Sequence, residues 1–281
     1  MMFKTPLLAS ACIASAATFS CLADDTVVVT FDNGTEGWSI NGWDVIDPEG
    51  GNPGANINID ITDSFGLDVR NSGPNENFVG NYFEKNVVQL GIDVKVNWII
   101  FQGIEVPRDF VVELRDYDNP PPSYPWVSVF LNVGALPAPD EGWESLVFEV
   151  PLQEDLPPGW GGTGAEDPKT LEPILPPDRT YGSVLRSVDA VVFTTFVPGY
   201  FYGFTDYNVR IDNISITTTT PQPCNGDLTG DGSVGGDDLT ILLAAWGPCP
   251  SECPADLDGN GVVNGADITI LLSEWGPCPS G

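Results

Sequence analysis

The chain has 281 residues, and its 40 Asp and Glu against 10 Lys and Arg give a formal net charge of −30. This negative charge argues against nucleic acid or another polyanion as a partner. Histidine is absent, which excludes Ser-His-Asp and Cys-His catalysis and histidine-ligated zinc, whereas carboxylate-pair chemistry such as glycoside hydrolysis stays open.

Residues 1–23 have the pattern of a cleaved secretory signal peptide. Lys4 precedes an apolar run from Leu7 to Phe19, and Cys21-Leu22-Ala23 offers small residues around a cleavage site. We therefore expect a secreted, extracellular or cell-surface protein. No later apolar run is long enough for a transmembrane segment, and none is expected.

Residues 24–216 read as short strands separated by loops rich in Gly, Pro, Asn and Asp. Asn56–Ile61 and Val209–Ile216 show the period of two that marks a half-buried strand. The expected strands are 26–31, 38–46, 55–61, 65–70, 83–89, 91–101, 110–117, 126–131, 143–150, 188–195 and 209–217. This many strands in one stretch predicts a mainly β protein with an antiparallel jelly-roll β-sandwich.

Three features of this region suggest a binding surface. Pro151–Thr180 is a long segment rich in Pro, Gly and acids, and it is either a mobile excursion or a binding loop. Its Trp160 is the best single aromatic candidate for exposure. Two aromatic clusters, at residues 124–126 and 200–204, either pack internally or form a platform for sugar rings. The candidate ligand-binding residues are Tyr124, Trp126, Trp160, Tyr200 and Tyr202.

An enzyme would have to use carboxylates. Glu113, Asp116, Glu144 and Glu149 lie in or beside expected strands. Nothing in their spacing selects a pair, so the catalytic residues are unknown.

Residues 217–223 form a Thr- and Pro-rich linker, which predicts a domain boundary there. Residues 224–281 contain one unit written twice at an offset of 29 residues, with Cys224, Cys249, Cys253 and Cys278 as the only cysteines after the signal. An even cysteine count in a small exported module predicts disulfides, and the count allows three pairings.

Each copy spaces oxygen-bearing residues as an EF-type calcium loop does, with Gly232 or Gly261 at the sharp turn. The expected ligands are Asp227, Thr229, Asp231, Ser233 and Asp238 in the first loop, and Asp256, Asp258, Asn260, Val262 and Asp267 in the second. Position 7 supplies a backbone carbonyl. Because the second loop has a carboxylate where the first has Thr229, we expect calcium to bind more tightly at Asp256–Asp267.

A helix should follow each loop, because apolar residues recur at i, i+3, i+4 and i+7. The stripes end at Trp246 and Trp275, ahead of Gly-Pro stops. One such helix cannot bury its stripe alone, so the two copies are expected to pack face to face with both tryptophans in the core.

The duplicated calcium loop and helix, with Asp at position 12 and no helix before the first loop, resembles a type I dockerin of the Cys-flanked variant. The resemblance covers about 55 of the 281 residues. It implies a small all-α calcium-binding module that binds a cohesin-type protein in polysaccharide-degrading systems. The family often has Ser or Thr at loop positions 10 and 11, where this chain has Gly236-Asp237 and Gly265-Ala266, and the family's basic helix residues are missing.

A dockerin-like arrangement also implies which cysteines pair. Its helices lie antiparallel, so the two cysteines of one copy would sit at opposite ends of a helix of about 15 Å. Since a disulfide needs Cα atoms within about 7 Å, we expect Cys224–Cys278 and Cys249–Cys253.

The expected β-sandwich, residues 24–216, resembles the galactose-binding-like and laminin-B-like jelly rolls of exported bacterial proteins. The resemblance is carried by Phe31–Trp38 at its start and Arg210–Ser215 at its end, with shorter motifs between them. It implies carbohydrate or surface binding and a structural calcium held by Asp32 and Asp212.

These features together predict a bacterial, secreted, calcium-binding protein of the dockerin type, linked to polysaccharide degradation. Its sandwich would be a non-catalytic module for polysaccharide or a cell-surface glycan, docked through residues 224–281. Two alternatives stay open: a glycoside hydrolase or other carboxylate-dependent polysaccharide-active enzyme, and a structural cell-surface protein.

Overall fold

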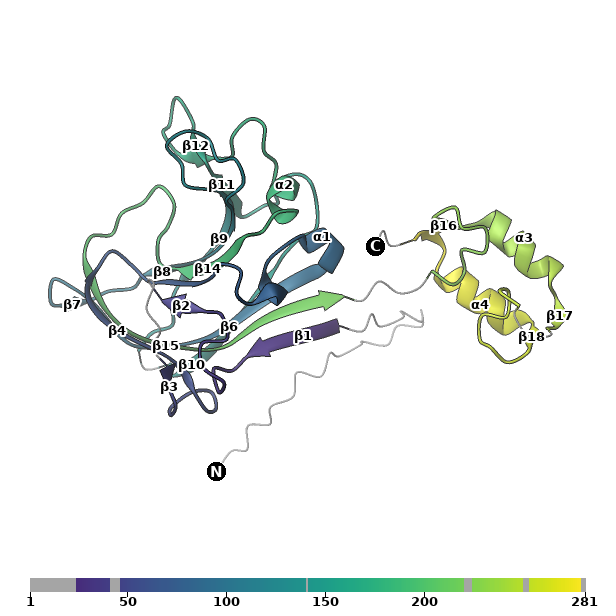
Figure 1. Ribbon diagram of the computed structural model, residues 1–281, viewed down its shortest axis with the longest axis horizontal. Helices are drawn as coiled ribbons and strands as arrows, with labels where there is room; N and C mark the ends of the chain where they lie inside the picture. Colours follow the sequence, from purple (N-terminus) through teal and green to yellow (C-terminus); the bar gives the residue numbers. More distant parts are fainter. Residues whose placement is uncertain (1–23, 41–45, 140, 220–223, 250–252, 279–281) are drawn as a thin grey trace. The chain divides into compact units, whose positions relative to one another are not determined.

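The computed structural model describes residues 24–40, 46–139, 141–219, 224–249 and 253–278. The chain forms two compact units that divide between Thr220 and Pro221, and each is described by itself (Figure 1). The expected signal peptide and residues 220–223 of the expected linker lie outside the described residues. Within the described part of the chain, no helix is long and apolar enough to cross a membrane.

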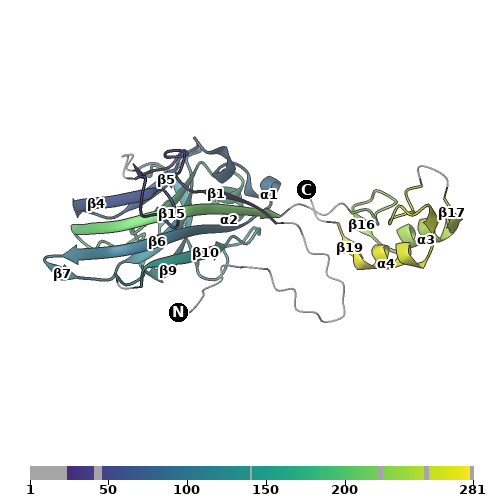
Figure 2. The same ribbon diagram turned by 90° about the horizontal axis from the view of Figure 1, so that it is seen from below.

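One layer of the larger unit is a seven-stranded antiparallel sheet (Figure 2). Its strands run in the order β10 (Trp143–Glu149), β6 (Val87–Phe101), β15 (Thr205–Thr219), β4 (Asn56–Ser64) and β3 (Ile46–Asp47); β1 (Asp24–Val29) also pairs with β15, and β7 (Ile104–Glu105) with β6. Residues 217–219, expected to begin the linker, instead end β15. They are β-branched threonines that pair with residues 24–26 of β1, so the strand continues beyond the predicted boundary.

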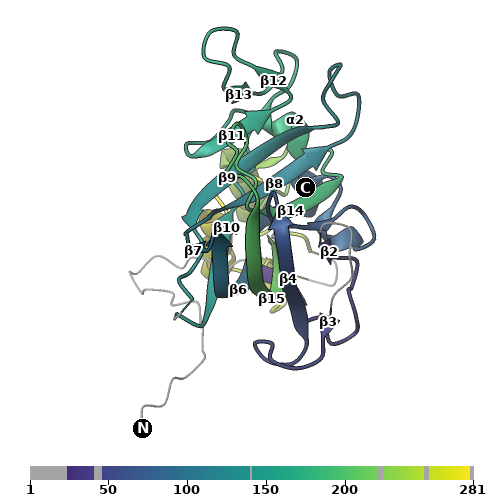
Figure 3. The same ribbon diagram turned by 90° about the vertical axis from the view of Figure 1, so that its left-hand side faces the viewer.

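The second layer is a six-stranded antiparallel sheet (Figure 3). Its order is β11 (Trp160–Thr163), β9 (Val127–Ala135), β8 (Asp109–Asp116), β14 (Ala190–Thr194), β5 (Asp68–Asn71) and β2 (Ser39–Ile40). Phe193 of β14 lies between the sheets, 5.8 Å from the Trp38 ring and 6.0 Å from the Phe148 ring of β10. Two antiparallel sheets around such a core form the expected jelly-roll β-sandwich.

The first part of one expected strand is a helix. Residues 83–89 divide between α1 (Tyr82–Lys85) and the start of β6, after a 3₁₀ turn at Glu76–Phe78. The Asn81 side chain accepts hydrogen bonds from the first-turn N–H groups of Phe83 and Glu84, and Asn86 ends the helix with a φ of 50°. These caps stabilise a short helix that alternation alone does not predict.

The long segment Pro151–Thr180 is more ordered than expected. It contributes β11 to the edge of the six-stranded sheet and folds β12 (Ala165–Glu166) against β13 (Pro173–Ile174), before α2 (Tyr181–Leu185). A β-carbon at Gly161 would lie 2.4 Å from the Phe130 ring, so a glycine lets that ring lie over the edge strand.

The smaller unit contains two helices, α3 (Gly236–Ala244) and α4 (Gly265–Ser273). The short strand β16 (Ser233–Val234) precedes α3 and pairs with β19 (Gly276–Pro277), while β17 (Gly247–Pro248) pairs with β18 (Val262–Val263), which precedes α4. The start of each helix therefore lies beside the end of the other, so the helices are antiparallel. Disulfides join Cys224 to Cys278 and Cys249 to Cys253, the pairs implied by a dockerin-like arrangement.

The apolar stripe predicts that the two C-terminal tryptophans are core residues, and this prediction is wrong. Trp246 is 54% exposed and Trp275 is 52% exposed. Leu242 and Leu271 are fully buried, and with Val234 and Val263 they fill the interior. The first helix ends at Ala244, and the Trp246 N–H bonds to the Leu243 carbonyl (3.4 Å), a tight i to i+3 turn. That turn places Trp246 beside Leu243 instead of beside Leu242.

Candidate functional site

One candidate site is a pocket of about 590 Å³ on the outer face of the six-stranded sheet. Along β8, Val112 and Leu114 point into the core, so Glu113 and Arg115 point outward. Strands β5 and β11, which lie beyond the two strands paired with β8, present their own outward residues to the same space. The lining residues are Asp68, Arg70, Glu113, Arg115, Tyr124, Pro125, Trp126, Thr163, Phe196, Val197, Pro198 and Tyr200.

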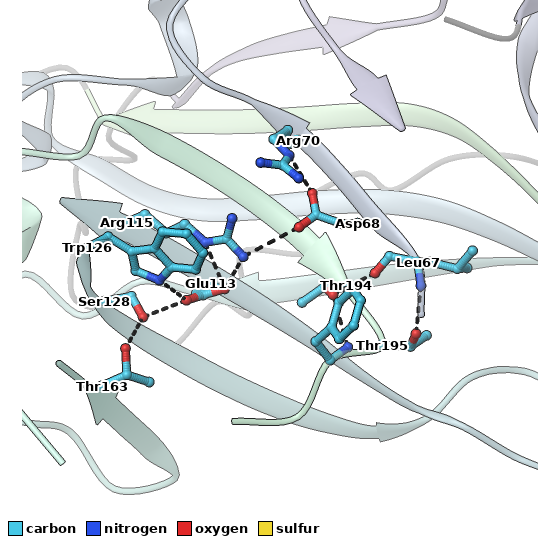
Figure 4. Close-up of polar contacts among 11 residues, drawn as sticks. Leu67, Asp68, Arg70, Glu113, Arg115, Trp126, Ser128, Thr163, Thr194 and Thr195 are labelled. Carbon is cyan, nitrogen blue, oxygen red and sulfur yellow. Dashed lines mark hydrogen bonds and ion pairs between the residues drawn. The ribbon is translucent and has the colours of Figure 1, made fainter. Parts of the chain in front are cut away.

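The floor of the pocket is a chain of charged side chains (Figure 4). Arg115 donates from Nε and Nη2 to Oε2 of Glu113, at 3.0 and 2.7 Å. Its Nη2 also lies 3.5 Å from Oδ2 of Asp68, whose other oxygen is 2.6 Å from Nε of Arg70. Two carboxylates and two guanidinium groups balance each other, so the floor carries no net charge.

Burial and ion pairing shift the pKa values of Asp68 and Arg115 in this floor. Burial raises the pKa of Asp68, and the nearby Arg115 and Arg70 offset that rise only in part. Burial by itself lowers the pKa of Arg115, but Glu113 and then Asp68 outweigh it, so the net pKa is raised. Arg115 thus stays cationic at any ordinary pH.

Glu113 links the floor to the aromatic wall. Its second oxygen, Oε1, accepts from Trp126 Nε1 at 3.0 Å and from the Ser128 hydroxyl at 2.6 Å, and Ser128 contacts Thr163 at 2.7 Å. The Trp126 ring also lies against the guanidinium of Arg115, with 4.0 Å between Cζ and the ring centre. The indole is fixed at its edge and on one face.

Arg115 also has one buried nitrogen without an acceptor in the described part of the chain. The residue is only 3% exposed, and its Nη1 finds no hydrogen-bond acceptor among the described residues. A buried N–H without an acceptor is unfavourable, so the pairing of Arg115 with Glu113 and Asp68 must offset this cost. Tyr124 and Tyr200 stand at the rim, and Tyr200 is 63% exposed.

The structure therefore brings together Tyr124, Trp126 and Tyr200 from the predicted ligand set. Tyr202 does not line this pocket; its ring lies 4.5 Å from that of Tyr200 and stacks on Arg108. The expected exposure of Trp160 is wrong. Trp160 is 8% exposed because β11 pairs with β9 and turns the indole into the core, edge-on to Tyr181.

Three residues of the floor, Asp68, Arg70 and Arg115, are not among those predicted from the sequence. Arg115 was within reach, since it lies two positions after Glu113 in a strand and must share its face. The joining of β5 to this face depends on the pairing of β5 with β14, and local sequence does not encode that pairing.

The other carboxylates considered for catalysis do not meet Glu113 in the pocket. Glu144 and Glu149 lie on β10 of the other sheet, with their side chains in solvent. Asp116 is buried and lies 2.6 Å from Nη1 of Arg179.

Asp32 and Asp212 come together around the turn at Gly51–Ala55. Asp32 accepts from the Ala55 N–H (3.0 Å), and Asp212 accepts from the N–H groups of Asn52 (2.6 Å) and Asn213 (2.7 Å). Burial raises the pKa of Asp212 to about 6, and repulsion from Asp93 and Asp32 adds to this against the two N–H donors.

The same turn has a cradle of oxygens. A β-carbon at Gly51 would lie 2.4 Å from the Ala55 carbonyl oxygen, 2.6 Å from that of Gly54 and 2.7 Å from Oδ2 of Asp212. Carbonyl and carboxylate oxygens are the donors that Ca²⁺ takes. The residues present therefore fit a calcium ion held by Asp212 and the turn, with Asp32 beside it.

In the second C-terminal loop, carboxylate oxygens of Asp256, Asp258 and Asp267 lie within 4.8 Å of one another. Asp267 is buried and accepts from the N–H groups of Leu257 (2.8 Å) and Asn264 (2.7 Å). Burial alone would raise the pKa of Asp267, but its backbone N–H donors outweigh that and lower it. The Asn260 side chain donates to Asp258, and the Val262 N–H to Asn260.

The first loop has the same plan with fewer charges. Asp238 is buried and accepts from the N–H groups of Thr229 (2.9 Å) and Gly235 (2.7 Å). The Thr229 hydroxyl lies 3.3 Å from Asp227, and the Ser233 hydroxyl donates to Asp231 at 2.8 Å. Both loops present an oxygen-only donor set, which fits calcium better than a soft transition metal.

Comparison with known proteins gives structural likenesses only: no protein-family model and no curated protein matches the chain. The family 11 carbohydrate-binding module from Clostridium thermocellum, solved with a β-1,3-1,4-mixed-linked tetrasaccharide, is 11% identical with a TM-score of 0.37, over 72% of this chain and 92% of that one. The N-terminal modules of an endo-1,4-β-D-xylanase from C. thermocellum, complexed with xylohexaose, are 10% identical with a TM-score of 0.39, over 82% of this chain and 34% of that one. An exo-β-agarase is 13% identical with a TM-score of 0.37, over 80% of this chain.

This chain spans about a third of the length of the xylanase and agarase chains, at 34% and 32%. At these identities and TM-scores the likeness concerns the β-sandwich fold alone.

Proposed function

We propose that the larger unit binds carbohydrate in the pocket over β8. The observation that carries this is the Trp126 ring, fixed by Glu113 and Arg115 at the edge of a pocket whose lining combines aromatic and charged side chains. Sugar rings present apolar C–H faces that stack on aromatic rings, and hydroxyl oxygens that accept from charged donors. Tyr124 and Tyr200 add aromatic surface at the rim.

The same geometry favours binding over hydrolysis. Each oxygen of Glu113 accepts two hydrogen bonds, from Trp126 and Ser128 at Oε1 and from two nitrogens of Arg115 at Oε2. A general acid or base must reach the proton that it transfers. Glu113 is committed to positioning Trp126 and Arg115 instead.

Retention on polysaccharides tests the proposal. The mature chain and its Trp126→Ala variant are passed over insoluble β-glucan, xylan and agarose, with release of reducing sugar measured in parallel. We expect retention on at least one matrix, lost in Trp126→Ala and kept in Trp143→Ala, a matched tryptophan on the opposite sheet. Retention that survives Trp126→Ala, or sugar release that Glu113→Gln abolishes, would refute carbohydrate binding at this site.

We infer that residues 224–278 form a calcium-dependent, dockerin-like docking module for a cohesin-type protein. Two oxygen-lined loops at a fixed offset, antiparallel helices and the Cys224–Cys278 clasp support this. The disulfides also support an oxidising location outside the cytoplasm, in keeping with an expected signal peptide at residues 1–23. The fitting oxygens around Gly51 support a third, structural calcium in the sandwich.

Calcium dependence can be measured on the intact chain. Titration calorimetry should find calcium binding that Asp256→Asn with Asp258→Asn reduces, and EDTA should lower the Tm of the smaller unit with both disulfides intact. An unchanged Tm with EDTA would remove the calcium claim for this unit.

A further inference from the structure

The smaller unit exposes an apolar surface that its interior does not use. Leu243 is 49% exposed, Trp246 54%, Leu272 52% and Trp275 52%. We call these four residues the Leu/Trp face. Large apolar side chains on a small soluble unit mark an interaction site when they are contiguous.

The topology places the four residues together. The pairings β16–β19 and β17–β18 make the helices antiparallel neighbours, and the two copies of the sequence are then related by a twofold axis that passes between the helices and perpendicular to both. A rotation about that axis leaves a residue on the same side of the helix pair. Leu243 and Leu272 are therefore on one side, and so are Trp246 and Trp275.

The two pairs also share that side. The i to i+3 hydrogen bond from the Trp246 N–H to the Leu243 carbonyl brings their side chains nearly into register along the helix. The second copy repeats the preceding turn, where the Glu274 N–H bonds to the carbonyls of Ile270 and Leu271 as that of Ala245 does to Ile241 and Leu242. The matched exposures of the copies agree with this symmetry.

The net charge of the unit indicates which kind of partner could bind the Leu/Trp face. Residues 221–281 contain nine acids and no Lys or Arg. Two bound calcium ions, with four charges, would leave a net charge of about −5 (−9 + 4). A second copy of this chain, at −30 overall, would be repelled, and so would an anionic lipid surface.

We propose that the Leu/Trp face docks onto a partner protein whose apolar surface is rimmed by lysine and arginine. This rests on the proposed docking role of residues 224–278 and states which chemistry meets it. The apolar contact supplies affinity from the two tryptophans and two leucines, and the net negative charge of the unit steers a basic partner and repels an acidic one.

A pair of designed peptides tests the face on the full mature chain at saturating calcium. Both are amphipathic helices with the same leucine face, one carrying lysine and the other glutamate at its polar positions. The lysine peptide is expected to bind, and the variant with Leu243, Trp246, Leu272 and Trp275 all changed to Ser should bind at least about tenfold more weakly. The matched control is Ile241→Ser, an equally apolar residue, 40% exposed, that lies two positions from Leu243 on another side of α3.

Each outcome decides the matter. If the variant with all four substitutions keeps its circular dichroism spectrum, its calcium binding and its disulfides, and only its peptide binding falls, the Leu/Trp face is the docking surface. Equal binding by wild type and variant would show attraction by charge alone and overturn the proposal, as would wild-type dimers in sedimentation that the same changes abolish. If the wild-type chain showed no calcium binding in the titration, this would instead count against the proposed calcium-dependent role, which the peptide experiment does not measure.

Discussion

The guanidinium carbon of Arg115 lies 4.0 Å from the centre of the Trp126 ring, and both side chains hydrogen bond to opposite oxygens of Glu113. The three residues form one rigid unit, because moving any of them breaks a contact of the other two. Because the indole is already fixed, little of its side-chain entropy would remain to be lost if a sugar ring stacked on it as proposed.

Trp126 should respond in graded steps to substitution. Trp126→Ala removes the stacking surface and should weaken carbohydrate binding by roughly 2 kcal/mol, which is about thirtyfold. Trp126→Phe keeps an aromatic face but loses the Nε1 hydrogen bond to Glu113, so it should retain part of the affinity. Calorimetry with a soluble oligosaccharide of the retained polysaccharide measures both, and equal losses in the two variants would contradict a stacking role.

Glu113 and Arg115 should be strongly coupled in the stability of the sandwich. Glu113→Leu leaves Arg115 buried beside an apolar side chain and should cost about 3 kcal/mol of unfolding free energy. The double variant Glu113→Leu with Arg115→Met removes both buried charges and should be less destabilised than the single one. Urea unfolding of wild type, Glu113→Leu, Arg115→Met and the double variant gives the double-mutant cycle, and additive losses would show that the pair is not coupled.

The pH dependence of the sandwich should carry the mark of Asp212. Its folded pKa, about 6, lies above the ordinary value of 3.8, so the folded state holds a proton that the unfolded state releases. Its contribution to stability is therefore fully present below pH 3.8 and is lost as the pH rises through 6, by roughly 2 to 3 kcal/mol without calcium. Thermal unfolding in EDTA across this range measures the loss.

Calcium should reverse that loss, because it binds the ionised carboxylate. Asp212→Asn should flatten the pH dependence between pH 4 and 6, while Asp60→Asn, an exposed acid on the neighbouring strand β4, should leave it intact. A wild-type sandwich whose stability in EDTA rises over the same range would contradict the proposed burial of Asp212.

Periodicity and turn chemistry could predict much of this fold. Alternation along residues 56–61 and 209–216 indicated half-buried strands, and both lie in the seven-stranded sheet. The helix at residues 82–85 depends on the caps Asn81 and Asn86, which compete with alternation over a short stretch. The predicted exposure of Trp160 is wrong because its burial requires β11 to pair with β9, a contact across nearly thirty residues of sequence that no local pattern carries.

The candidate sites likewise divide into residues that local sequence identifies and residues that only tertiary pairing brings together. Loop spacing identifies oxygen donors such as Asp256 and Asp267 directly, since their geometry is local. The pocket floor, in contrast, joins Asp68 on β5 to Arg115 on β8 through the intervening strand β14. Tertiary pairing alone creates that neighbourhood, so strand alternation could select Glu113 and Arg115 but not their partner.

The turn at Gly51 offers a separate steric test of the sandwich calcium. Gly51→Ala would place a methyl group within 2.7 Å of two carbonyl oxygens and Oδ2 of Asp212, in the space between the proposed donors. We expect a loss of roughly 1 to 3 kcal/mol in stability and of the calcium-dependent rise in the Tm of the sandwich. A Gly51→Ala chain whose sandwich still gains stability from calcium would place the ion elsewhere.

The two C-terminal loops should bind calcium with unequal affinity, and one residue should account for much of the difference. Asp258 at position 3 of the second loop brings a carboxylate within reach of Asp256 and Asp267, whereas the first loop has the Thr229 hydroxyl there. A carboxylate is a stronger calcium ligand than a hydroxyl, and affinity rises with ligand charge. Thr229→Asp should therefore tighten the weaker site by about tenfold and bring it close to the stronger one, while Thr240→Asp, at an exposed threonine of α3 outside the loop, should not. Titration calorimetry resolves the two sites, and a Thr229→Asp chain whose weaker site is unchanged would show that position 3 does not contact the ion.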